Sequence, residues 1–220
     1  MTLPLSPSSN AQALIQAVEQ ATSPVALLLA VRSLAELRSV DAIPTLIQVL
    51  GYNNPGAAVA AVDGLVNLGD LAAPVILEQI DGYNYGARAW AIRALSRIGH
   101  PDALDTLTEA ARQDFSLSVR RAAAKGLGTL RWAVLPPDQQ RPVQMQTLET
   151  LTAVCADGEW VVRYAAIAGL QALAMVLDPA DSAVADIRRL LQQQAATDET
   201  LAVQARALWA LQAIAPEGKA

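Results

Sequence analysis

The stretch "VLGYNNPGAAVAAVDGLVNLGDLAAPVILEQIDGYNYGARAWAIRAL" (residues 49–95) contains the same pattern twice. Gly-Tyr-Asn occurs at 51–53 and again at 82–84, and each copy is followed by an alanine-rich segment ending in a leucine, Leu65 or Leu95. Gly and Asn are residues that tight turns favour. A turn that returns after 31 residues, before a segment of the same pattern, indicates a repeat protein.

Six segments of the chain follow this pattern, and each has an anchoring leucine. The anchors are Leu34, Leu65, Leu95, Leu127, Leu170 and Leu211. Apolar residues stand four and three positions before every anchor and three positions after it. This spacing places them on one face of an α-helix, so each segment is predicted to be an amphipathic helix.

A second apolar segment separates successive anchored helices. Examples are "AIPTLIQVL" (42–50), "AAPVILEQI" (72–80) and "ALDTLTEAA" (103–111). A proline stands near the start of each, where it costs little because first-turn N–H groups lack helical partners. No alternation of period two persists, so no sheet is expected. The sequence predicts an all-α, right-handed α-solenoid of about five to six HEAT-like helix pairs, forming one domain over residues 1–220.

Charged residues also recur at fixed distances from the anchors. The ladder residues are Arg88, Asp114, Arg120, Asp157, Arg163 and Asp198, with Gln204 in place of the last arginine. In stacked HEAT-type repeats, an Asp at the turn accepts hydrogen bonds from a neighbouring guanidinium and from helix N-terminal amides. We therefore assign these residues to a structural ladder rather than to catalysis.

The longest interruption is "RWAVLPPDQQRPVQ" (131–144), which holds three of the 12 prolines. We predict a non-helical excursion here, because proline disrupts helices. Insertions in solenoids often lie on one face, so this loop is either a partner contact or a plain connector.

Composition excludes several classes of protein. The net charge of −5 and a sequence pI near 4.9 do not suit a non-specific nucleic-acid binder, which needs a basic surface. The single cysteine permits no internal disulfide, which favours a reducing cytosol. The N-terminus lacks the features of a signal peptide. The most hydrophobic run, "PVALLLAV" (24–31), is too short for a membrane span. We expect a cytoplasmic location.

The parts of common active sites are absent. One histidine, His100, and one cysteine, Cys155, make a His/Cys zinc site implausible, so no metal is expected. The chain has no P-loop, dinucleotide fingerprint or Gly-x-Ser-x-Gly motif. We assign structural roles to His100 in its turn and to Cys155 at a helix end.

One repeat carries an unusual set of side chains off the core stripe. Positions five before, two before and two after the third anchor are Trp90, Arg93 and Arg97. Candidate neighbours in this basic and aromatic patch are Asp63, Tyr83, Tyr85 and Lys125. Aromatic rings stack and arginine pairs with carboxylates, so the patch suits a flat, conjugated, anionic ligand. The alternative, that Trp90 packs under a neighbouring helix and the arginines are solvated, stays open.

Three segments carry a family resemblance: "LGYNNPGAAVAAVDGL" (50–65), "DGYNYGARAWAIRAL" (81–95) and "DFSLSVRRAAAKGLGTLRW" (114–132). They resemble the phycobilin lyase family with HEAT-like repeats, and within it the smaller, F-type subunits of heterodimeric E/F-type phycocyanobilin lyases. The resemblance covers about residues 10–175, and the block "YNYGARAWAIRAL" (83–95) is its most specific part.

This resemblance implies an enzyme subunit that works with a homologous larger subunit. Together they would join phycocyanobilin, a linear tetrapyrrole, to a cysteine of the phycocyanin α-subunit through a thioether. The nucleophile would then belong to the acceptor protein, and the bilin would be a substrate, with no cofactor required. The implied location is the cyanobacterial cytosol, near phycobilisomes.

On physical grounds we assign each residue of the patch a role in binding the bilin. Trp90, Tyr83 and Tyr85 would pack against the pyrroles, Arg93 and Lys125 would pair with propionates, and Asp63 would handle a proton or hydrogen-bond the rings. A competing function is a non-catalytic HEAT-like adaptor that binds phycobiliproteins or bilins during phycobilisome assembly or degradation, because a solenoid fold alone does not establish catalysis. A covalent chromophore adduct would separate the two.

Overall fold

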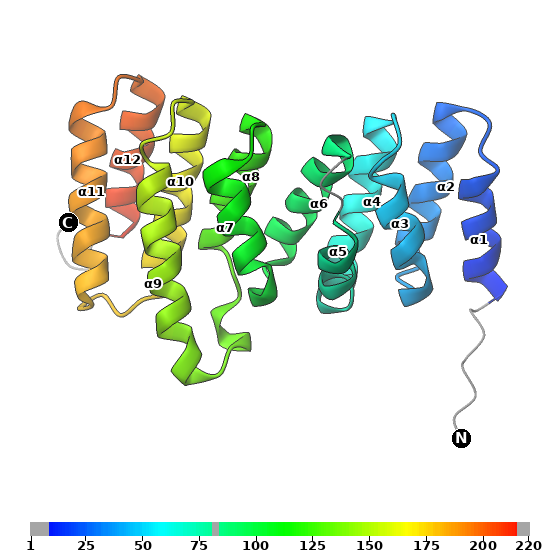
Figure 1. Cartoon of the computed structure of the whole chain (residues 1–220), viewed down its shortest axis with the longest axis horizontal. Helices are drawn as coiled ribbons and strands as arrows, with labels where there is room; N and C mark the ends of the chain where they lie inside the picture. The colour runs from blue at the N-terminus through cyan, green and yellow to red at the C-terminus, as the bar shows by residue number, and fades with distance from the viewer. Residues whose placement is uncertain (1–8, 81–83, 215–220) are drawn as a thin grey trace. The chain divides into compact units, whose positions relative to one another are not determined.

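The computed structural model describes residues 9–80 and 84–214, which form twelve α-helices and, within those ranges, no strand (Figure 1). The helices divide into two compact units, the first ending at Ile98 and the second beginning at Gly99. The first unit contains α1 (Ser9–Glu19), α2 (Pro24–Glu36), α3 (Ile43–Val49), α4 (Pro55–Leu68), α5 (Ala73–Gln79) and α6 (Tyr85–Ile98). The second contains α7 (Leu104–Gln113), α8 (Leu117–Gly128), α9 (Pro137–Val154), α10 (Trp160–Ala174), α11 (Ser182–Thr197) and α12 (Leu201–Ala213).

Within each unit the helices form antiparallel pairs, and the second helices of successive pairs pack side by side. Helix α4 lies between α2 and α6 in the first unit, and α10 lies between α8 and α12 in the second (Figure 1). This confirms the predicted all-α fold of stacked helix pairs. The expectation of a single domain over 1–220 stays a prediction.

The anchoring leucines lie in the core, as the helical spacing predicts. Leu34, Leu65, Leu95, Leu127 and Leu170 have no exposed surface. Leu211 is half-buried, because α12 has only one neighbouring second helix, α10. Each repeat of the apolar pattern in the sequence therefore contributes one layer of side chains to the core.

Asparagine side chains begin two of the second helices in the same way. Asn54 Oδ1 accepts a hydrogen bond from Ala57 N at 3.0 Å, and Asn84 Oδ1 accepts from Ala87 N at 3.0 Å. Such caps satisfy N–H groups that have no partner inside the helix. Asn54 Nδ2 also donates to Pro24 O at 2.9 Å, which ties the start of α4 to the start of α2. Asn54 therefore both caps α4 and fixes the start of α4 against the start of α2.

The prediction of a non-helical excursion over 131–144 is wrong for most of the segment. A 3₁₀ turn occupies Trp132–Val134, and α9 begins at Pro137 and continues through Pro142. Pro137 stands at the first helical position, where no N–H is needed. Pro142 removes a single helical hydrogen bond, and later residues of α9, such as Leu151, are buried and hold the helix in place.

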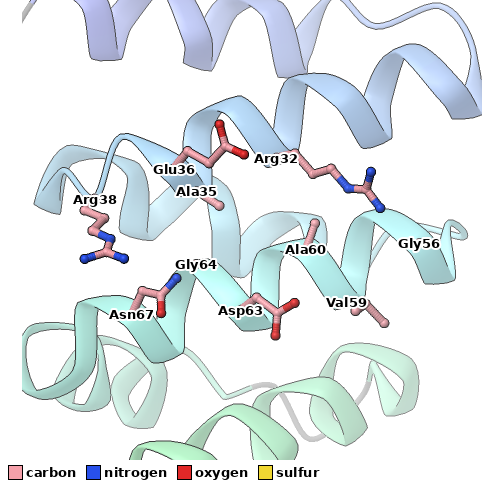
Figure 2. A pocket seen from close by; sticks show the side chains of 10 residues that line it. All are labelled: Arg32, Ala35, Glu36, Arg38, Gly56, Val59, Ala60, Asp63, Gly64 and Asn67. Atoms are coloured by element: carbon pink, nitrogen blue, oxygen red, sulfur yellow. The ribbon is translucent and has the colours of Figure 1, made fainter.

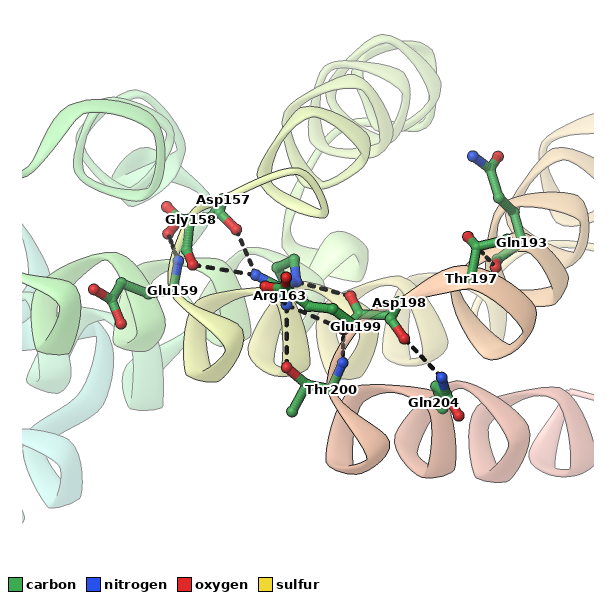
Figure 3. A network of polar contacts seen from close by, with 10 residues as sticks. All are labelled: Asp157, Gly158, Glu159, Arg163, Gln193, Thr197, Asp198, Glu199, Thr200 and Gln204. Carbon is green, nitrogen blue, oxygen red and sulfur yellow. Dashed lines mark hydrogen bonds and ion pairs between the residues drawn. The ribbon is translucent and has the colours of Figure 1, made fainter.

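Two rungs of the charged ladder are present in the second unit. Arg120 donates to Asp157 through Nε (2.7 Å) and Nη2 (3.1 Å), and Arg163 donates to Asp198 through the same atoms at 2.8 and 3.0 Å. Arg163 Nη1 also donates to Asp157 O at 2.9 Å, so one side chain links two successive turns (Figure 3). A rung between Arg88, in the first unit, and Asp114, in the second, stays a prediction.

Gln204 replaces arginine where the ladder ends. Its Nε2 donates to Asp198 O at 2.6 Å, which repeats the contact of Arg163 with its own turn (Figure 3). The neutral amide keeps the bond to the preceding turn without a positive charge that would need a further carboxylate.

We predict that Asp198→Asn destabilises the second unit and flattens its acid dependence. The hydrogen bond from Arg163 lowers the pKa of Asp198, so its stabilisation is present above the unfolded pKa of about 3.9 and is lost as pH falls through the lower folded pKa. Breaking a buried pair costs about 3–5 kcal/mol at pH 7. Urea denaturation from pH 7 to pH 3 measures both effects.

The control is Asp186→Asn, which removes the exposed pair of Asp186 with Arg189 on α11. Exposed pairs contribute about 0–1 kcal/mol, so this variant should match the wild type. A pH dependence that is unchanged in Asp198→Asn would contradict the proposed contribution of the ladder.

In the described ranges, no single helix has the length and apolar composition needed to cross a membrane; Pro55–Leu71 and Ala73–Gln79 meet that test only together, as a pair bent by 113°.

Candidate functional site

Asp63 is held by an ion pair between neighbouring second helices. Arg97 Nη1, on α6, donates to Asp63 Oδ1, on α4, at 2.6 Å. About half of each side chain is exposed, at 52% for Asp63 and 48% for Arg97. The two residues stand two before and two after their anchors, which is why the packing of α4 against α6 brings them together. The carboxylate is therefore oriented but remains accessible to a ligand.

Asp63 also lines a pocket of about 330 Å³ between α2 and α4. Its walls are Arg32, Ala35, Glu36, Arg38, Gly56, Val59, Ala60, Asp63, Gly64 and Asn67 (Figure 2). Arg38 and Asn67 lie at one end and Arg32 and Val59 at the other (Figure 2). The pocket thus combines two guanidinium groups with two carboxylates, those of Glu36 and Asp63, and an apolar floor. Its guanidinium groups can pair with the carboxylates of a ligand that has an apolar body.

The floor of this pocket depends on small residues at the helix contact. A side chain at Gly64 would place its Cβ 2.7 Å from Cβ of Ala35. Because Gly64 has no side chain, α4 approaches α2 closely beneath the charged groups of the rim.

Arg38 enters the pocket from a strained backbone position. Its φ is 52°, and it is the only non-glycine residue with positive φ in the part of the chain that the structure describes. Four residues after the next two anchors stand Gly69 (φ 57°) and Gly99 (φ 68°). The first repeat therefore has arginine where its neighbours have glycine, at a cost of about 1–2 kcal/mol. Strain of this kind is typical of functional positions.

Trp90 and Arg93 form a stacked pair on α6. The guanidinium carbon of Arg93 lies 4.5 Å from the centroid of the Trp90 ring, and both side chains are half-buried. Along α6, Arg97 follows Arg93 by one turn, so the stacked pair and the ion pair to Asp63 form one continuous surface. This arrangement differs from a Trp90 fully covered by a neighbouring helix. Tyr85 is the first residue of α6 and is 59% exposed.

Two other residues predicted to contact the ligand, Tyr83 and Lys125, are not placed beside Trp90 and Arg93. Tyr83 lies outside the described residues. Lys125 is exposed on α8 and belongs to the second unit. Both remain predictions.

Three charged residues of the pocket were not predicted as site residues from the sequence: Arg32, Glu36 and Arg38. Arg32 and Glu36 stand two before and two after the first anchor, so the register that selected Asp63 and Arg97 would also have found them. Arg38 has a weaker signal, the absence of glycine at a position where the next two repeats have it.

The single histidine and the single cysteine have structural environments. His100 caps a 3₁₀ turn, with Nδ1 accepting a hydrogen bond from Asp102 N at 3.2 Å. Cys155 is 2% exposed, and burial, together with the charge of Asp198, raises the pKa of its thiol to about 12. The thiolate is the nucleophilic form of cysteine, so this thiol is unreactive near neutral pH. No cluster suited to a metal ion occurs within 9–80 and 84–214.

We predict that Cys155→Ala keeps the activity of the chain. The raised pKa leaves almost no thiolate at pH 8, so iodoacetamide should not label the folded wild type at that pH. Because the thiol is unreactive, the Cys155→Ala variant should act at the wild-type rate. Mass spectrometry of the alkylated protein and a rate assay check this. Rapid labelling, or a loss of activity without a loss of fold, would contradict it.

Comparisons with known proteins give consistent results. The family described as HEAT repeats matches residues 11–82 and 73–171. The chain is 55% identical to "Phycocyanin alpha phycocyanobilin lyase CpcF" of Synechocystis sp. (strain ATCC 27184 / PCC 6803 / Kazusa) over 203 residues, 92% of this chain and 94% of the relative. It is 56% identical to "Phycobilisome maturation protein" of Synechococcus elongatus over 194 residues, 88% of this chain and 92% of the relative.

A solved structure is also similar. It is "The structure of the complex of CpcE and CpcF of phycocyanin lyase from Nostoc sp. PCC7120", with 50% sequence identity and a TM-score of 0.74. The match covers 78% of this chain and 99% of that chain.

Proposed function

The chain belongs to the HEAT-repeat family of phycocyanobilin lyase β subunits, and on that premise we propose that it attaches phycocyanobilin to a cysteine of the phycocyanin α-subunit. It acts as an enzyme subunit together with a homologous larger subunit. The observation that carries this proposal is the 55% identity to a named lyase over 92% of the chain. Its partner is proposed from the relative that forms a complex of CpcE and CpcF.

The surface of the first unit fits this function chemically. A linear tetrapyrrole is a flat conjugated chain with carboxylate side groups. We assign the stacked Trp90, with Tyr85 at the helix start, to the pyrrole rings. Arg93 and the pocket residue Arg38 take the propionates, because guanidinium groups pair with carboxylates in bidentate geometry. Lys125 and Tyr83 remain proposed contacts to a propionate and to a ring.

The pocket of about 330 Å³ is at the lower end of the range of about 300–1,000 Å³ for small-molecule sites. A four-ring bilin is longer than such a pocket. We therefore place one end of the bilin between α2 and α4, and the rest along the surface of α6 that carries Arg97, Arg93 and Trp90.

The reaction needs positioning and proton handling but no oxidant or cofactor. The acceptor thiol adds across the ethylidene double bond: a C–S bond forms, the C=C π bond is lost, and the thiol proton ends on the adjacent ring carbon. We assign Asp63 to accept hydrogen bonds from pyrrole N–H groups or to carry that proton. Arg97 holds the carboxylate in position through its 2.6 Å contact. Holding the reactants in line and transferring a proton are both established sources of rate enhancement.

The proposed location is the cyanobacterial cytosol, near phycobilisomes, where the acceptor protein and the bilin are found.

Co-expression of this chain with the apo phycocyanin α-subunit, a bilin source and the larger subunit tests the proposal. The expected result is a chromophore that stays on the α-subunit in a denaturing gel, only when both lyase chains are present. A bilin or α-subunit that binds without a covalent adduct would instead favour the adaptor function.

A further inference from the structure

A second group of aromatic and basic side chains lies in the second unit. The guanidinium carbon of Arg206, on α12, lies 4.8 Å from the ring centroid of Trp209 and 5.7 Å from that of Tyr164, on α10. Helices α10 and α12 pack directly against each other. We call Tyr164, Arg206 and Trp209 the α10–α12 cluster.

Arg206 is buried and has no acidic partner among residues 9–80 and 84–214. Its exposed fraction is 7%, and its Nη1 atom has no hydrogen-bond partner among the described residues. Arg163, which is equally buried, has Asp198 as its partner. Burial lowers the pKa of Arg206, and the electrostatic effect of Tyr164 opposes this shift. Buried charges in proteins are normally paired, so this guanidinium is short of an anion.

The cluster occupies the same repeat positions as the stacked pair of the first unit. Trp90 and Arg93 stand five and two residues before their anchor, Leu95. Arg206 and Trp209 stand five and two residues before Leu211, with the two residue types exchanged. Each unit therefore carries a tryptophan–arginine pair at the same two positions of a second helix.

The exposure of the aromatic residues leaves room for a flat ligand. Trp209 is 60% exposed and Tyr164 is 37% exposed, although both lie beside a buried guanidinium. An exposed indole has free surface on which a conjugated ring can stack. Because more than half of the Trp209 side chain is exposed, its ring has room to shift and admit a carboxylate to Arg206.

We propose that the α10–α12 cluster is a second carboxylate-binding site, which takes a propionate of another open-chain tetrapyrrole molecule than the one assigned to the first unit. The proposal rests on the proposed function for the class of ligand, and on the unpaired, buried Arg206 for the site. The carboxylate supplies the missing anion and accepts hydrogen bonds from the guanidinium, while a pyrrole ring packs on Trp209. No covalent step takes place here.

Equilibrium binding to the complete heterodimer tests the second site. The probes are phycocyanobilin and its methyl ester, in which the propionates carry no charge. The wild type should bind two molecules of the free acid. Arg206→Gln should weaken the binding of one of them by about tenfold, equivalent to about 1.4 kcal/mol, and leave binding of the ester unchanged. The matched control is Arg189→Gln, which removes an exposed arginine of α11 and should bind both probes like the wild type.

Thermal melting distinguishes a binding role from a structural one. Arg206→Met removes an unpaired buried charge and keeps an apolar stem of similar length, so its melting temperature should not fall. A lower melting temperature with unchanged affinity for the acid would overturn the second site, as would an equal loss of affinity for acid and ester. A wild type that binds neither probe would also overturn it.

The outcomes separate this inference from the proposed function. Covalent adduct formation with unchanged bilin binding by Arg206→Gln overturns the second site alone. Binding of the acid that depends on Arg206, without any adduct from the wild-type complex, overturns the lyase function and supports the second site.

Discussion

Replacement of Asp63 by asparagine is expected to slow bilin attachment by at least about a hundredfold. A positioned acid or base contributes about 10²–10⁴ to a rate, and asparagine cannot take up the proton. Asparagine has nearly the shape of aspartate, and Arg38, Arg93 and Trp90 are unchanged. Bilin affinity should therefore fall by less than about tenfold. The measurements are the single-turnover rate of adduct formation and a separate binding titration with the complete heterodimer.

The fold of this variant should be preserved. Asp63 and Arg97 are about half exposed, and exposed ion pairs contribute about 0–1 kcal/mol. Asp63→Glu keeps the carboxylate and should retain part of the rate. Asp186→Asn, the same change on the outer surface of α11, is the matched control. A wild-type attachment rate in Asp63→Asn would remove Asp63 from the mechanism.

Replacement of Gly128 by alanine is expected to destabilise the second unit by about 3–5 kcal/mol, near the upper end for single substitutions. A Cβ at Gly128 would overlap the backbone of Gly169, and a Cβ at Gly169 would lie 2.6 Å from the carbonyl oxygen of Ala124. Backbone atoms within helices cannot move aside as a flexible side chain can. Helices α8 and α10 must therefore separate, and the buried layer between them, including Leu127 and Leu170, is lost.

Circular dichroism melting measures this effect, and a fall of roughly 10–20 °C is expected for a unit of this size. Gly158→Ala is the matched control, because Gly158 lies in the turn before α10 with no atom within 4 Å of the added Cβ. Equal melting temperatures for Gly128→Ala and the wild type would show that the two helices do not meet as closely as the structure has them.

The sequence was sufficient to predict the helices and their order, because each buried layer requires apolar residues at the same three positions around Leu95 or any other anchor. It could not predict that 137–144 is helical. Prolines in a short stretch of sequence disfavour a helix. Pro137 is tolerated because it stands at the first helical position, and Pro142 is tolerated because later residues of α9 are buried and hold the helix in place.

The candidate site was partly predictable for the same reason. Asp63 and Arg97 share a register, so the periodicity placed both on one face, and it would have added Arg32 from the first repeat. The backbone at Arg38 could not be predicted, because a positive φ at arginine opposes the intrinsic preference of the residue. The lack of a hydrogen-bond partner for Arg206 Nη1 depends on the positions of all surrounding polar atoms. No local sequence pattern predicts those positions.

The most direct test of the account is reconstitution from purified components: this chain, the larger subunit, the apo phycocyanin α-subunit and phycocyanobilin. The quantity measured is the rate at which chromophore becomes resistant to denaturing extraction, with each protein omitted in turn. We expect a covalent adduct on the α-subunit that requires both lyase chains and forms at least a hundredfold more slowly with Asp63→Asn. An adduct that forms equally fast without this chain would contradict it.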